Sequence, residues 1–301
     1  MKTRLALCIM TLIIVLSSAS LTVAASPETT RSPEQTLQEY VSSQNARDWD
    51  AMASLEPDDR AVLTRSFFAQ KDNAGQGIFD ITGAELVHAK QIPLGFAGIG
   101  ERRSLKDVAD ADIKVYYVAI NYSIPIENKY VHNGLNYRLA ILVKDGKEWR
   151  VRDFEGAPVN HIVARGLGFG GDHEKQEADR ITALASQTSS APSSINLLLG
   201  NEENCQAYFG EPCWYGVHVV TIPFTDYQKD VLPNEWWNSP IPHAEAQKAG
   251  AMAVKMYGWY HVEVAPKWPN YGAECDDTTN CQVYLLNSRT SPSNTVGAHI
   301  V

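Results

Sequence analysis

The sequence predicts an α+β fold, and three observations lead to that class. A helical pattern comes first, several strand-like runs rich in β-branched and aromatic residues follow, and the last third alternates a strand-like run with helices. Because helices precede antiparallel strands joined by short turns, we expect the sheet to curl over the helices. With 301 residues, 44% hydrophobic and 20% charged, the chain is long enough for two domains with buried cores.

A secretory signal peptide is predicted over residues 1–25. Lys2 and Arg4 form a basic start, residues 5–16 are almost wholly apolar, and the Val-Ala-Ala at 23–25 supplies small residues for cleavage. The apolar run is short for a membrane span, and an uncleaved anchor is the alternative. We therefore expect the protein to be extracellular or in the cell wall.

The formal net charge of −9 argues against nucleic acid as a partner, because phosphates favour Lys/Arg patches. It also removes electrostatic steering toward anionic surfaces. Any bound polymer is expected to be held by stacking and hydrogen bonds.

Four cysteines follow the signal peptide: Cys205, Cys213, Cys275 and Cys281. In an exported chain they favour two disulfides, and of the three possible pairings we favour the local ones, Cys205–Cys213 and Cys275–Cys281. Zinc bound by Cys275 and Cys281 is the alternative, with His261 as the histidine within easy reach. No other cofactor is expected.

The first helical pattern covers residues 33–55. Ser32 and Gln35 are spaced for a capping box, and Pro33 suits the first helical position. A second short helix is expected to include Met52 and Leu55.

Four strands are expected next, and Asp145-Gly146 predicts a hairpin turn between the last two. They lie at residues 78–87, 113–122, 137–143 and 149–154.

This order, with YVSSQNARDWDAMASL and KDGKEWRVRDFE, resembles the SnoaL-like cone fold of the nuclear-transport-factor-like superfamily, over roughly Pro33–Val159. The resemblance implies helices on a curved antiparallel sheet, and we assign residues 33–160 to this domain. Asp80 and His88 are acid–base candidates by residue type only. A non-catalytic accessory domain is the expectation.

Gly166, Gly168 and Gly171 match the dinucleotide pattern G-x-G-x-x-G, with a strand-like run before them and a helix-like run after. We reject that interpretation because no second strand follows and no acid lies about 20 residues on. Residues 161–195, which end in a Ser-rich stretch, are predicted to be a helical and flexible linker.

The final segment, 196–301, begins with a strand-like run at 215–222. Thr225 and Gln228 are spaced for a capping box, and we expect the short helix that follows to stop at Leu232 because Pro233 cannot continue it comfortably. Glu235 would then lie at or just past a helix end, exposed to a cleft.

A second helix is predicted from about His243 to Tyr260. Its small residues recur at helical spacing on one face, which we expect another element to approach closely. That face comprises Ala246, Ala249, Gly250, Ala253 and Tyr257.

Three blocks in order, DYQKDVLPNEW, EAQKAGAMAVKMY and CDDTTNCQVY, resemble the stage II sporulation protein D (SpoIID) family, from about Leu197 to the C-terminus. That family includes lytic transglycosylases and amidase-enhancer proteins of peptidoglycan. The resemblance implies that Glu235 is catalytic. It places Lys255 where relatives usually carry arginine, which keeps the charge without the guanidinium fork.

The resemblance also implies cleavage of the MurNAc–GlcNAc bond with the sugar's own 6-hydroxyl as nucleophile, so one carboxylate acts as general acid and then base. Trp236 and Trp237 would desolvate Glu235, and these rings with Tyr257 would bind sugar faces. The expected partners are glycan strands of peptidoglycan and cell-wall amidases.

The alternative is a non-catalytic wall-binding or amidase-enhancing module. SpoIID domains normally continue well beyond position 301, so we expect a truncated, N-terminal portion of such a domain. In addition, Asn280 stands where relatives often carry a histidine that supports zinc. A cleft built only in part would bind glycan without cleaving it.

Overall fold

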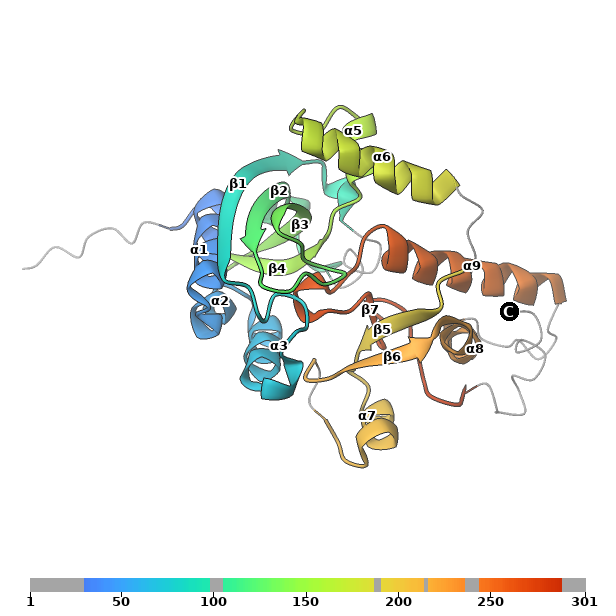
Figure 1. Ribbon diagram of the computed structural model, residues 1–301. Coiled ribbons are helices and arrows are strands. Elements are labelled where there is room, and N and C mark those ends of the chain that lie inside the picture. The colour runs from blue at the N-terminus through green and yellow to red at the C-terminus, as the bar shows by residue number, and fades with distance from the viewer. Residues whose placement is uncertain (1–29, 98–104, 187–190, 214–215, 236–243, 289–301) are drawn as a thin grey trace, which may run out of the picture. The chain divides into compact units, whose positions relative to one another are not determined.

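The computed structural model describes residues 30–97, 105–186, 191–213, 216–235 and 244–288, and Arg31–Val301 form one compact unit (Figure 1). Its described part is an α+β structure with a four-stranded antiparallel sheet. Within it, no helix is both long and apolar enough to cross a membrane. The predicted signal peptide lies outside the described residues.

Three helices open the described chain: α1 (Pro33–Ala46), α2 (Trp49–Ser54) and α3 (Asp58–Ala69). The predicted capping box is present, because Ser32 Oγ accepts from the Gln35 amide and the Gln35 side chain accepts from the Ser32 amide. Arg47 has a φ of 55°, in the left-handed region, and this residue ends α1 before α2 begins.

The sheet has the order β1-β2-β3-β4, each strand antiparallel to the next. Its strands are β1 (Gly83–Ile92), β2 (Ile113–Ser123), β3 (Gly134–Asp145) and β4 (Glu148–Gly156). The predicted hairpin joins β3 and β4, with Gly146 at a φ of 61°. The first strand starts five residues later than expected, because Ile78 and Ile81 are buried in the core before it begins.

The two faces of this sheet pack against different helices. Tyr116, Val118 and Ile120 of β2 join α1–α3 in one core cluster, while alternate residues such as Val115 and Tyr117 join the other cluster. The second cluster includes residues of α5 (Val159–Ala164) and α6 (Asp172–Ser186), which Figure 1 shows together beside the sheet. Short 3₁₀ turns complete this part: η1 (Lys71–Asn73), η2 (Leu94–Phe96) and η3 (Asp110–Asp112).

The glycine-rich segment follows α5, a helix rather than the strand that a dinucleotide site requires. The Glu174 carboxylate accepts hydrogen bonds from the amides of Phe169 and Gly170, at 2.8 and 2.7 Å. A side chain of the protein itself therefore occupies these backbone donors. In α6, Ala178 and Ile181 are buried against the sheet, so the helix contributes to its core.

The last segment builds a small second sheet with the order β6-β5-β7, in which β5 is antiparallel to β6 and parallel to β7. A third core cluster links it to two helices, and the turn η4 (Pro269–Tyr271) precedes β7. The elements are β5 (Ser194–Leu198), α7 (Glu202–Phe209), β6 (Val219–Pro223), α8 (Phe224–Glu235), α9 (Ala244–Glu263) and β7 (Cys275–Asp276).

Both local disulfides are present, Cys205–Cys213 and Cys275–Cys281, with Cα–Cα distances of 5.4 and 5.6 Å. His261 lies beside the second pair, and the possible ligand atoms of the three residues are within 4.8 Å of one another. A disulfide offers no thiolate, however, so this bond argues against zinc there. The His261 Nδ1 pairs with the Ala265 carbonyl, and burial lowers the pKa of its imidazole to about 4.

The two predicted segments share core residues. Leu198, Trp268, Tyr271 and Ala273 belong to the same cluster as the apolar residues of α1–α3. Beside them, the buried Lys267 Nζ bonds the carboxylates of Asp153 and Glu155 on β4. We use the term buried junction for this group of charged residues: Lys267, Asp153 and Glu155 with the neighbouring Arg60 and Glu56.

Candidate functional site

Glu235 is the last residue of α8, and the helix reaches it by continuing through Pro233. The expectation that the helix stops at Leu232 is wrong, as is the Thr225 cap, because the helix already begins at Phe224. Proline so close to a helix end removes only one helical hydrogen bond. In the same turn, the Asp230 carbonyl accepts hydrogen bonds from Asn234 Nδ2 at 2.6 Å and from Ser288 Oγ at 2.7 Å.

The Glu235 side chain is exposed, as its predicted position at a helix end implied. Its Oε1 accepts a hydrogen bond from the Val283 amide at 2.6 Å. This contact spans 48 residues of sequence and joins the first SpoIID-like block to the third. The carboxylate is thus fixed at one oxygen by the backbone while the side chain stays open to solvent.

A buried contact behind Glu235 joins the same two blocks. Tyr227 of α8 is fully buried, and its hydroxyl donates to Gln282 Oε1 at 2.8 Å. Burial raises the pKa of this phenol well above its ordinary value, with Tyr257, Asp276 and Glu235 adding to the rise. Tyr227 therefore stays neutral and acts as a donor that positions the segment carrying Val283.

The second block packs on this pair through α9, although not on the predicted face. Three alanines of the predicted face are exposed, namely Ala246, Ala249 and Ala253. The buried face of α9 instead comprises Gly250, Ala251, Val254, Gly258 and Val262. A Cβ at Gly258 would lie 2.9 Å from the Tyr227 ring and 3.2 Å from that of Phe224. The close approach to α8 is therefore at Gly258, which directly follows Tyr257, the last residue of the predicted small-residue face.

The other predicted site residues are placed differently. Lys255 is half-buried on α9, and in the described part of the chain no hydrogen bond or ion pair joins it to Glu235. Tyr257 is half-buried and packs edge-on against the His261 ring. Burial raises the pKa of Tyr257 to about 12, and Glu235 is among the carboxylates that add to the rise. Trp236 and Trp237 lie outside the described residues.

The acid–base candidates of the first segment have structural contacts instead. Asp80 accepts a hydrogen bond from the Gly75 amide, and the His88 ring packs against Phe169 with centroids 5.1 Å apart. No interaction between Asp80 and His88 is found in the part of the chain that the structure describes.

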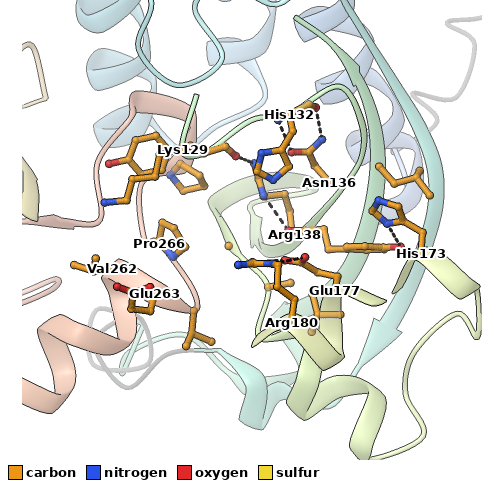
Figure 2. A pocket seen from close by; sticks show the side chains of 18 residues that line it. Lys129, His132, Asn136, Arg138, His173, Glu177, Arg180, Val262, Glu263 and Pro266 are labelled. Carbon is orange, nitrogen blue, oxygen red and sulfur yellow. Dashed lines mark hydrogen bonds and ion pairs between the residues drawn. The ribbon is translucent and has the colours of Figure 1, made fainter. Parts of the chain in front are cut away.

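A separate cavity of about 530 Å³ lies where β3, α6 and the end of α9 meet (Figure 2). None of the site residues predicted from sequence lines it. Its walls include His132, Arg138, His173, Glu177 and Glu263. One signal could have pointed to it: a single arginine, Arg138, interrupts the apolar run at residues 137–143.

Comparisons with protein-family models, curated proteins and solved structures gave no match for this chain. The two family resemblances therefore stay predictions from the sequence.

Proposed function

We propose that this protein is exported and acts on peptidoglycan, with Glu235 as the single acid–base group of a lytic-transglycosylase-like cleavage of the MurNAc–GlcNAc bond. One observation carries the proposal. The three SpoIID-like blocks, separated in sequence, meet at one place: the Val283 amide holds Glu235, Tyr227 binds Gln282, and Ala251 and Val254 of the second block pack in the same core cluster as Tyr227.

The geometry suits a carboxylate that works alone. Val283 fixes the orientation of Glu235 through one oxygen, and the side chain is exposed at the end of its helix. In a reaction whose nucleophile is the substrate's own hydroxyl, the acid donates a proton to the leaving oxygen and takes one from the attacking hydroxyl. A second carboxylate, as in ordinary glycosidases, is not required.

The test is incubation of the purified protein with intact and with peptide-stripped glycan strands, followed by mass spectrometry of the soluble products. Anhydro-muropeptides are expected, and Glu235→Gln should lower their yield by about 100-fold or more. Glu203→Gln, the same change at an exposed residue of α7, is the matched control and should retain activity. Equal yields from wild type and Glu235→Gln would contradict the proposal.

A non-catalytic wall-binding or amidase-enhancing role is the second candidate, and the exposure of Glu235 favours it. Apolar enclosure is what usually keeps a catalytic carboxyl protonated near neutral pH. This role predicts no cleavage products and co-sedimentation with purified wall material that survives Glu235→Gln. Stimulation of a wall amidase by both wild type and variant would support it further.

A further inference from the structure

The cavity of Figure 2 is distinct from the Glu235 site and is formed by both predicted segments. β3 and α6 supply one side, and the end of α9 with the following residues supplies the other. Figure 2 shows Arg138 between His132 and the Glu177–Arg180 pair, with Val262 and Pro266 across from it.

Arg138 is the unusual residue of this cavity. It is only 6% exposed. Its Nη1 donates to the Tyr137 carbonyl at 3.0 Å and its Nη2 to the Tyr130 carbonyl at 2.5 Å, whereas its Nε has no hydrogen-bond partner. Among the described residues, no carboxylate forms an ion pair with it. A buried guanidinium without an ion-pair partner is costly, and here Glu177 offsets the cost only at longer range.

The other two cations at the cavity have partners. Arg180 bonds Glu177, one turn earlier in α6, at 2.7 and 2.8 Å, and Lys129 pairs with the buried Glu274. Glu263 also lines the cavity, but among the described residues neither Glu263 nor Glu177 forms an ion pair with Arg138, and Glu177 attracts it only at longer range. A carboxylate on a ligand would give Arg138 a direct ion-pair partner.

We propose that this cavity binds a small organic carboxylate, with the carboxylate on the Arg138 guanidinium. Two of the five guanidinium N–H groups are used by backbone carbonyls, and the second N–H on each of Nη1 and Nη2 remains for a planar carboxylate, while Nε is buried without a partner. Val262, Val264 and Pro266 offer apolar surface to the body of the ligand. A volume of about 530 Å³ fits a molecule of dipeptide size.

Such a carboxylate could belong to a short peptide or to a simple aliphatic acid. Isothermal titration of the full chain with N-acetyl-Ala-Ala and with hexanoate separates these sources. Each acid is compared with its own neutral amide, which has nearly the same shape. We expect at least one acid to bind, and its amide to bind about 10- to 100-fold more weakly because the charge-assisted bond is lost.

Arg138→Gln should weaken binding of that acid by a similar factor of about 10 to 100. The matched control is Arg31→Gln, which removes an arginine paired with Glu39 and Glu148 elsewhere in the unit and should bind like wild type. Three results would overturn the proposal: no binding of either acid up to about 10 mM, equal binding of acid and amide, or undiminished binding by Arg138→Gln.

A second measurement on the unaltered protein covers the case in which Arg138→Gln does not fold. Burial lowers the pKa of the His132 imidazole, and the charge of Arg138 lowers it further. A carboxylate bound to Arg138 should raise the His132 pKa, which NMR titration measures with and without saturating acid. An unchanged His132 pKa would count against the proposal as decisively as a failed titration.

Discussion

The end of α8 and the buried junction both contain acidic residues, but the carboxylate is exposed at the first and the carboxylates are buried at the second. Glu235 is exposed and bonds one backbone amide, that of Val283. At the junction, the Asp153 and Lys267 side chains are only 2% and 3% exposed and bond each other at 3.3 Å. Buried charges at the junction are bonded to other charges of the same chain, whereas the exposed carboxylate of Glu235 remains accessible to solvent.

Two cations and three carboxyl groups make up the junction. Lys267 lies between Asp153 and Glu155, while Arg60 is 3.9 Å from Asp153 and stacks over the Trp268 ring at 4.5 Å. Glu56 is the third carboxyl, and the hydroxyls of Tyr40 and Thr64 donate to it. Because β4 supplies two of these acids and the last segment supplies Lys267, this network joins the two predicted segments.

The largest effect is expected from Lys267→Met. The change removes a buried ammonium and leaves Asp153 and Glu155 buried without it, which typically costs about 3–5 kcal/mol. Urea denaturation should show the midpoint falling, and the free energy of unfolding should drop by this amount.

The matched control is Lys248→Met on α9, whose ammonium pairs with Glu245 at 2.9 Å but is 56% exposed. It should cost no more than about 0.5 kcal/mol. Adding Glu155→Gln to Lys267→Met removes one positive and one negative charge and keeps the Arg60–Asp153 pair, so it should recover part of the loss. If Lys267→Met and Lys248→Met cost the same, the distinction between the two regions would fail.

The carboxyl group of Glu56 is expected to make the free energy of unfolding depend on pH, by about 3 kcal/mol. Burial raises the pKa of its carboxyl to about 7, despite the opposing hydrogen bonds from Thr64 and Tyr40 and the charge of Arg60. The folded state thus holds this proton more tightly than the unfolded chain, whose carboxyl has the ordinary pKa of 4.5. The resulting stability is complete below pH 4.5 and is lost as the pH rises through about 7.

Glu56→Gln removes this titration while keeping the size of the side chain. Relative to wild type, the variant should therefore gain stability between pH 4.5 and pH 8, by up to about 3 kcal/mol at the upper end. Urea unfolding at several pH values measures the difference, in which all other titrating groups cancel. A difference that is flat or falls with pH would show that Glu56 is not held as a neutral acid.

Local chemistry made much of the fold predictable. Ser32 and Gln35 cap α1 because both partners lie within four residues, and Asp145-Gly146 turns the β3–β4 hairpin because glycine adopts positive φ. The short separations within each cysteine pair made the two disulfides the simplest pairing. In each case the deciding interaction is near in sequence.

The missed features depend on residues far apart in sequence. The last turn of α8 is held by a bond from Ser288 to the Asp230 carbonyl, and Gly258 is tight only because Tyr227 and Phe224 pack on it. The cavity around Arg138 exists only once β3, α6 and α9 come together. At the candidate site, position alone could be predicted: Glu235 is at a helix end, but its contact with Val283 follows from tertiary packing.

The smallest of the three effects is expected from opening the Cys275–Cys281 disulfide with Cys275→Ala and Cys281→Ala. Closing so short a loop restricts the unfolded chain by about 2–3 kcal/mol, so the free energy of unfolding should fall by that amount. Val283, two residues after Cys281, should lose hydrogen-exchange protection at its amide more than the β2–β3 amides do, because the disulfide holds this segment beside α8. If protection of Val283 is retained while global stability falls, the Glu235 contact does not depend on the disulfide, and the end of α8 is organised by the Tyr227–Gln282 packing instead.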